Sequence, residues 1–277
     1  MRIGFLMDPL ENVRVDHDST FALMLECRRR GLEVRELRQE WLYVADGRAR
    51  ARMRTVEVQR IAGAHFRVSV DADAPLAELD VLFLRKDPPV DVDFVRATQM
   101  VELGPGPLLI NHPRGLRAAN EKLFALRFPD LVPPTLVARD LPRLRAFIDA
   151  QAQAYLPAVR EGDKRIILLG GEPLGAVLRV PREGELRANF ASGGSAAPAL
   201  LTPRDREICR RLAPALSELG LWLVGIDVIG GRLTEVNVTS PTGLVEIDAL
   251  NGESLEARVI DFALQRAGLP ARAAAGM

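Results

Sequence analysis

Apolar residues recur along this chain in short unbroken runs and in longer segments with helical spacing. The runs at 2–7 and 32–37 are typical of buried strands, and a helix is expected between them. Asp18 or Ser19 can cap that helix, which is expected to end at Gly31. Because a strand, a helix and a second strand follow one another, the pattern predicts a parallel sheet with right-handed crossovers.

The same order returns later in the first half. Further strands and helices are expected at 79–89, 91–103, 107–111, 114–126, 135–138 and from 140 onward. The first of these strands places Arg85 and Asp87 at its carboxyl end, where open α/β sheets hold ligands. Arg85 can clamp a substrate carboxylate, and an internal ion pair between Arg85 and Asp87 explains the spacing equally well. Lys122, on the helix expected at 114–126, is by itself an ordinary surface lysine.

The second half begins near Tyr155 with a different pattern. A loop and two strands joined at 170–173 carry Asp163, Arg165 and Arg179, which by default are paired surface charges. A Gly-, Ala- and Ser-rich stretch at 181–200 is expected to be a mobile loop. Two helices, from about Thr202 and at 254–267, complete the pattern.

Residues 220–243 are expected to form a buried hairpin, and they carry three oxygen donors, Asp227, Glu235 and Asn237. An acid in such an apolar strand costs free energy unless a cation or hydrogen bonds compensate it. With a two-residue turn at Gly230 and Gly231, Asp227 and Glu235 lie on opposite faces; a longer turn or a bulge puts them opposite each other. We predict the second register, in which the donors converge and suit Mg²⁺. A hairpin whose acids face water is the alternative.

Composition limits the classes of function. A chain of 277 residues suggests two domains, and 37 basic against 37 acidic residues give no general attraction to nucleic acid or an anionic membrane. Arginines alternate with apolar residues at 48–54, and with zero net charge a solvated strand face is favoured over a nucleic-acid stripe. Cys27 and Cys209 have no CxxC neighbour, and no signal peptide or long apolar run is seen, so a soluble protein of the reducing cytoplasm is expected.

Six motifs occur in a characteristic order: LMDP, LRKDPP, NEKLFA, YLPAVREGDKRI, RANFASGG and GIDVIGGRLTEVNVTSPTG. In this the chain resembles the prokaryotic glutathione synthetases of the ATP-grasp superfamily, from residue 1 to about 267. The resemblance implies an α/β fold, with an N-terminal parallel domain at 1–115 and an ATP-grasp domain with an antiparallel sheet at 116–277. It also implies an ATP-dependent ligase that joins glycine to γ-glutamylcysteine through an acyl phosphate, with Mg²⁺ or Mn²⁺, as a homo-oligomer.

The resemblance also implies roles for the residues that match its motifs. Asp227, Glu235 and Asn237 look like the metal ligands, and Arg165 and Arg179 like the catalytic cations that face phosphate or the acyl intermediate. The nucleotide side is assigned Lys122, Asp163, Tyr155 and Leu156. The peptide substrate is assigned Arg85, Ser240 and Thr242.

The chain departs from the family in one place. Between about residues 150 and 155, family members carry a few dozen more residues, including a lysine on the adenine side and a glycine loop over the phosphates. Here FIDAQAQ leads directly into YLP. Most of the subdomain that closes over ATP is therefore expected to be missing, unless the sequence omits a segment of the protein; an intact mass near 30.4 kDa would establish a true deletion. A lidless chain would be an impaired relative that acts as a binding protein; a related carboxylate-amine ligase is the remaining alternative.

Overall fold

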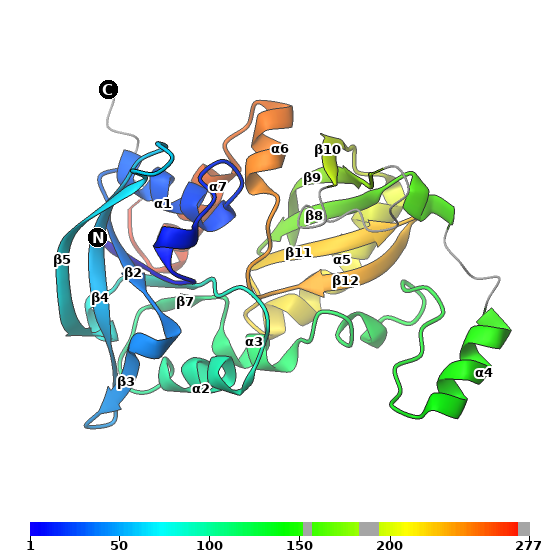
Figure 1. Ribbon diagram of the computed structural model, residues 1–277, viewed down its shortest axis with the longest axis horizontal. Helices are drawn as coiled ribbons and strands as arrows, with labels where there is room; N and C mark the ends of the chain where they lie inside the picture. Colours follow the sequence, from blue (N-terminus) through cyan, green and yellow to red (C-terminus); the bar gives the residue numbers. More distant parts are fainter. Residues whose placement is uncertain (152–156, 183–193, 271–277) are drawn as a thin grey trace.

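The computed structural model describes residues 1–151, 157–182 and 194–270, and these form two sheets. The first sheet has seven strands, ordered β3-β4-β2-β1-β6-β7 with β5 paired to β4, and the second has five, ordered β10-β9-β8-β11-β12. Figure 1 shows the two sheets side by side, with helices between and around them. No helix of the described residues is long and apolar enough to cross a membrane.

The parallel sheet predicted for the first half is confirmed. Strands β1 (Arg2–Leu6), β2 (Glu33–Leu37), β6 (Val81–Leu84) and β7 (Leu108–Ile110) pair in parallel. Helix α1 (Ser19–Arg29) joins the first two, and its cap is Asp18, whose side chain accepts a hydrogen bond from the Phe21 N–H at 2.7 Å. Helix α2 (Val92–Met100) joins the other two. Because neighbouring parallel strands have their carboxyl ends at the same edge of the sheet, the carboxyl ends of β1 and β6 lie together, beside the start of α1.

Three antiparallel strands extend this sheet. They are β3 (Leu42–Ala45), β4 (Arg48–Val58) and β5 (Phe66–Pro75). The apolar residues that alternate with the arginines of β4 are buried. Arg52 pairs with Asp71 and Arg54 with Glu36, so acids of the same sheet compensate these two arginines.

The second sheet is antiparallel, as the resemblance implied. It consists of β8 (Asp163–Leu169), β9 (Glu172–Val180), β10 (Ser195–Pro198), β11 (Leu223–Ile229) and β12 (Arg232–Asn237). Helix α5 (Pro203–Glu218) starts with a reciprocal capping box between Thr202 and Asp205, and it buries Ile208 and Leu212 in the same core as Ile226. The other face of the sheet carries charged side chains.

The last two helices return to the first sheet. Helices α6 (Leu244–Asn251) and α7 (Leu255–Arg266) lie beside α1 in Figure 1, and Arg30 at the end of α1 donates to the Ala257 carbonyl at 2.9 Å. The sequence pattern did not predict α6. The C-terminal segment therefore packs on the N-terminal domain, and the domain boundary near residue 115 stays a prediction.

Two predicted elements are wrong in the segment that joins the sheets. Helix α3 (Pro113–Ala118) ends well before residue 126, because the Asn120 side chain accepts the Lys122 and Leu123 N–H groups at 3.1 Å and forms a turn instead. Residues 135–138 are irregular and form no strand. Helix α4 (Leu141–Gln151) follows, at the rim of the molecule and away from both sheets (Figure 1), with exposed Leu141 and Ile148.

An acidic pair where α6 meets α7 gives a testable pH dependence. Burial, together with a hydrogen bond shared with Glu256, raises the pKa of Asp248 to about 8. Because this pKa lies above that of aspartate in the unfolded chain, protonated Asp248 stabilises the folded protein. This stabilisation is fully present below about pH 4 and is lost as the pH rises towards 8. We expect Asp248→Asn to raise the free energy of unfolding at pH 8 by about 1 kcal/mol, since water screens this half-buried carboxyl group, and to change it little at pH 4. Urea denaturation at both pH values measures this, and a destabilised variant at pH 8 would contradict it.

Candidate active site

The β11–β12 hairpin sets the positions of the three predicted metal donors. Asp227 lies opposite Glu235, and Asn237 lies two residues further along the same face, opposite Gly225. The turn is the two residues Gly230 and Gly231, and a bulge after Asp227 shifts the register by one residue. Thr234 occupies that bulge and its hydroxyl donates to the Asp227 carbonyl at 3.0 Å. The predicted register is thus confirmed, and the bulge produces it.

Asp227 is buried among cations. Only 2% of the residue is exposed. Arg165, on the neighbouring strand β8, donates Nε to Oδ1 at 2.5 Å and Nη2 to Oδ2 at 2.9 Å. Arg179 of β9 places Nη2 at 2.9 Å from Oδ2, and Asn237 donates Nδ2 to the same oxygen at 3.3 Å. Burial alone would raise the pKa of Asp227, but the two guanidinium groups outweigh it and lower the pKa to about 2.

A second carboxylate completes this charged network. Asp163 pairs with Arg179, and burial together with the charge of Asp227 raises the pKa of Asp163 to about 6. Asp163 Oδ1 and Arg179 Nε are buried and have no hydrogen-bond partner among the residues that the structure describes. Arg165 and Arg179 are thus buried and not the surface charges that their spacing suggested. An unpartnered buried guanidinium N–H is a donor ready for an anionic oxygen.

Lys122 reaches the site from the turn after α3. Its ammonium group pairs with Glu235 at the open side of the hairpin, where 62% of the lysine side chain is exposed. The Val236 N–H donates to the Glu121 carbonyl at 2.8 Å, which fixes this turn to β12. The structure therefore brings Lys122 to the donor set, although it does not lie on the predicted helix.

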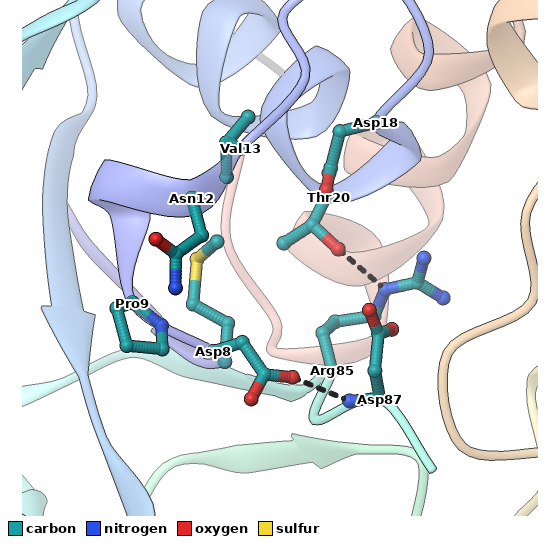
Figure 2. A pocket seen from close by; sticks show the side chains of 9 residues that line it. Asp8, Pro9, Asn12, Val13, Asp18, Thr20, Arg85 and Asp87 are labelled. Carbon is teal, nitrogen blue, oxygen red and sulfur yellow. Dashed lines mark hydrogen bonds between the residues drawn. The ribbon is translucent and has the colours of Figure 1, made fainter.

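The predicted substrate residues lie in the 239–243 turn, which contains Ser240 and Thr242, and beside it, where Arg85 contacts the turn. Arg85 is buried and donates Nε to Thr20 Oγ1 at 3.1 Å (Figure 2) and Nη2 to the Pro241 carbonyl at 2.9 Å, so the alternative ion pair with Asp87 is not formed. The next carbonyl, that of Thr242, accepts from Arg165 Nη1 at 3.1 Å. Ser240 is half-buried in the same turn. One short turn thus contacts both the predicted substrate arginine and the predicted catalytic arginine.

Sequence reasoning missed Gly225. A side chain at this position of β11 would place its Cβ 2.9 Å from Pro241 Cβ and 3.2 Å from Arg165 Cδ. Glycine therefore leaves the space in which Arg165 lies under the 239–243 turn. The only signal was a glycine inside an apolar strand, which commonly marks a close approach of other groups.

Asp227, Glu235 and Asn237 fit a hard divalent cation in kind, because they offer two carboxylates and an amide oxygen on one face of the sheet. Within the described residues, no group of three or more His, Cys, Asp or Glu side chains is placed to hold a metal. The set around Asp227 is not such a group, because its third donor is the amide of Asn237. Arginines hold the oxygens of Asp227 and Lys122 holds Glu235, so a bound cation would share these oxygens with them. Tyr155, Leu156 and residues 183–193 of the loop predicted at 181–200 lie outside the described residues. Within the same stretch the prediction is wrong at Ser195–Pro198, which form strand β10 by pairing with β9.

Comparisons with known proteins support both halves of the chain. The family model for the prokaryotic glutathione synthetase N-terminal domain matches residues 1–117, and the model for the corresponding ATP-grasp domain matches 149–252. The glutathione synthetase of Escherichia coli (strain K12) is 39% identical over 94% of this chain and 97% of its own length. That of Gloeobacter violaceus is 41% identical over 96% of this chain and 97% of its own.

Solved structures agree on the fold. The D-cycloserine synthetase DcsG is similar with a TM-score of 0.60 at 15% identity, over 96% of this chain and 99% of its own. The macrocyclase MdnC of Microcystis aeruginosa gives a TM-score of 0.61 at 10% identity, over 96% and 100%. At such identities the likeness concerns the fold alone.

The alignment with the Escherichia coli protein also measures a difference in length. It spans 306 positions, whereas 94% of a 277-residue chain is about 260 residues. About 45 positions of that relative therefore face no residue of this chain. This total agrees in size with the few dozen residues expected to be missing near 150–155.

Proposed function

Because this chain belongs to the family of prokaryotic glutathione synthetases, we propose that the charged sheet face around Asp227 is where it joins glycine to γ-glutamylcysteine. The chain is an ATP-dependent ligase of glutathione synthesis. The observation that carries the assignment of the site is the convergence of Arg165, Arg179 and three oxygen donors on one face of the second sheet. That face offers what phosphoryl transfer requires, namely fixed positive charge beside ligands for a divalent cation.

The reaction has two steps and needs no protein nucleophile. In the first, the cysteinyl carboxylate of γ-glutamylcysteine attacks the γ-phosphorus of ATP, the bond to the bridging oxygen breaks, and ADP leaves. In the second, the amine of glycine attacks the carbonyl of the acyl phosphate; phosphate leaves as the C–N bond forms, and the amine gives up its proton. The protein must align the reactants, neutralise charge and exclude water.

The cationic side chains of this face have distinct roles in the proposal. Arg179 Nε, which is buried and has no partner within residues 1–151, 157–182 and 194–270, would donate to an oxygen of the transferred phosphoryl group. Arg165, anchored by Asp227 and the Thr242 carbonyl, would stay in place and face the acyl intermediate. Lys122 lies at the open side, where its exposed ammonium group would contact the nucleotide. Asp163, Tyr155 and Leu156 stay assigned to the nucleotide side.

Asp227, Glu235 and Asn237 would hold Mg²⁺ or Mn²⁺. When bound, the cation would neutralise the phosphate oxygens of ATP. The cation would add positive charge beside Arg165, Arg179 and Lys122. Since Arg179 and Lys122 pair with the same carboxylates, these two side chains would need to turn towards phosphate as the cation binds, while Arg165 keeps its hydrogen bond to the Thr242 carbonyl.

A direct assay tests this function. ADP release should require γ-glutamylcysteine and glycine together, and removal of divalent cations with EDTA should abolish it until Mg²⁺ is restored. ADP release that requires neither γ-glutamylcysteine nor glycine would contradict the proposal. An amine other than glycine that supports faster ADP release would favour a related carboxylate-amine ligase.

A second candidate is an impaired relative that binds peptide without turning over ATP. The roughly 45 unmatched positions and the uncovered apolar residues of α4 favour it, because a closing subdomain normally shields the phosphates from water. Calorimetry distinguishes the two candidates. Micromolar ATP affinity with Mg²⁺ supports the ligase, and absence of ATP binding with intact peptide binding supports the impaired relative.

A further inference from the structure

The side-chain amide of Asn111 joins the two sheets. Asn111 directly follows β7 in the first sheet, and only 3% of the residue is exposed. Its Nδ2 donates to the carbonyls of Leu223 and Val238, each at 2.7 Å. Its Oδ1 accepts the N–H groups of Trp222 and Leu223 at 2.7 and 2.8 Å. An asparagine amide offers two N–H donors and two acceptor positions, so its whole hydrogen-bonding capacity is used here.

This amide takes the place of a strand residue in the second sheet. Gly225 of β11 lies opposite Asn237 of β12, so the same antiparallel register, continued by two residues, would set Leu223 opposite Thr239. Instead, both the N–H and the carbonyl of Leu223 bond to the Asn111 side chain. These are the two bonds that a directly opposite residue makes in an antiparallel ladder. The chain can therefore leave the sheet at Thr239, and β12 ends at Asn237.

The remaining N–H of the amide anchors the chain where β12 ends. Val238, whose carbonyl accepts this hydrogen bond, lies between the proposed metal donor Asn237 and the 239–243 turn. That turn in turn accepts a hydrogen bond from Arg165 Nη1 at 3.1 Å. A change in the path of the chain at Val238 would therefore move a metal donor on one side and the contact with Arg165 on the other.

The segment that carries Asn111 is itself held in place by backbone contacts. The His112 N–H donates to the Gly220 carbonyl at 3.0 Å. Gly115 approaches the same stretch so closely that a Cβ there would lie 2.4 Å from the Leu219 carbonyl oxygen. Only glycine permits this approach. The position of the amide is thus set by the main chain on both sides of the contact between the sheets.

We propose that Asn111 is a positioning residue for the ligation, whose amide ends β12 and fixes Asn237 and the 239–243 turn relative to the first sheet. The role in ligation rests on the proposed function, because that function makes Asn237 a metal donor. The amide acts through the backbone of Leu223 and Val238 and not on a reactant. Such a role matters because a group misplaced by about 1 Å can cost about 10²-fold in rate.

Hydrogen exchange tests the positioning without nucleotide, metal or peptide. Asn111→Asp keeps the size of the side chain and its acceptor oxygens but removes both donors, so two backbone carbonyls would face a carboxylate. We expect amide exchange in residues 236–243 to become at least about tenfold faster, because buried acceptors left unpaired weaken the local structure. Exchange in α1 should stay within about twofold of the wild type.

Glu26→Gln is the matched control. It makes the opposite exchange of a carboxylate and an amide at another buried side chain, 4% exposed, in the last turn of α1. Glu26 pairs there with Arg29 and Arg30, each at 2.6 Å. Its loss should speed exchange in α1 and leave residues 236–243 as they are in the wild type.

The Mg²⁺ requirement of ADP release is the second readout. The Mg²⁺ concentration for half-maximal ADP release should rise by about tenfold or more in Asn111→Asp, because Asn237 is displaced. It should be unchanged in Glu26→Gln. A merely structural role of Asn111 would reduce the amount of active protein and hence the apparent kcat, but it would not move this concentration.

Two results would overturn the proposal. One is exchange that speeds up equally in α1 and in residues 236–243 of Asn111→Asp; the other is an unchanged Mg²⁺ requirement in that variant. If Asn111→Asp does not fold, Asn111→Ser replaces it with the same expected results, because the smaller side chain leaves room for water. Failure of the ligase function would look different: the wild type would release no ADP, while the faster local exchange in the variant would persist.

Discussion

Replacing Asp227 with Asn is expected to lower the free energy of unfolding by about 3–5 kcal/mol, the range for breaking a buried ion pair from one side. The Arg165 and Arg179 side chains are 7% and 4% exposed, so water cannot replace the lost carboxylate charge. Arg179 keeps its pair with Asp163, whereas Arg165 loses the ion pair that it forms within the described residues. Asparagine can accept a hydrogen bond from one of them but supplies no charge. Urea denaturation without nucleotide or metal measures the loss, and a difference below about 1 kcal/mol would show that the ion pair is not the stabilising contact.

Glu235→Gln is the matched control. It removes a carboxylate from the same predicted metal site, but Glu235 pairs with the exposed Lys122. Exposed pairs contribute little, so the variant should lose less than about 1 kcal/mol. If Glu235 is a metal ligand, the variant should nevertheless need more Mg²⁺ for half-maximal ADP release. The pair of variants thus separates the structural role of Asp227 from the metal site that both residues are proposed to share.

The sequence predicted the architecture where the signal was local. The first strands and α1 follow from apolar runs and a capping aspartate, both of which act within a few residues. The turn after α3 shows the limit of such reasoning. Helical spacing continues through Lys122, but the Asn120 side chain competes for the backbone N–H groups and ends the helix. The resemblance to a family identified Lys122, whereas periodicity placed it on the wrong element.

The site itself depends on contacts that no spacing contains. Arg165 and Asp227 are 62 residues apart. Taken alone, Arg165 suggests a surface charge and Asp227 an unfavourable acid in an apolar strand. The register that joins Asp227 to Glu235 needed a choice between two turns, and the bulge at Thr234 decides it. The roles of Gly225 and Asn111 could not be predicted, because both are defined by distant segments that meet around them.

Replacing Arg165 with Lys is expected to lower kcat by about 10²–10³-fold, the usual effect of removing one donor that stabilises developing charge. Arginine makes two hydrogen bonds to Asp227 and a third to the Thr242 carbonyl. Lysine keeps the charge but loses the planar fork, so it can satisfy Asp227 or face the acyl intermediate, but it cannot do both.

Arg211→Lys is the control for this substitution. Arg211 forms the same two-fold contact with an aspartate, Asp130, at 2.9 and 3.1 Å, but both side chains of this pair are exposed at the surface. Its kcat should stay within about twofold of the wild type, because exposed ion pairs contribute little. Steady-state ADP release at saturating γ-glutamylcysteine and glycine gives kcat. Circular dichroism confirms that each variant is folded. If Arg165→Lys keeps kcat within a few fold, Arg165 only anchors Asp227, and Arg179 with its open Nε would be the cation that meets the phosphoryl group.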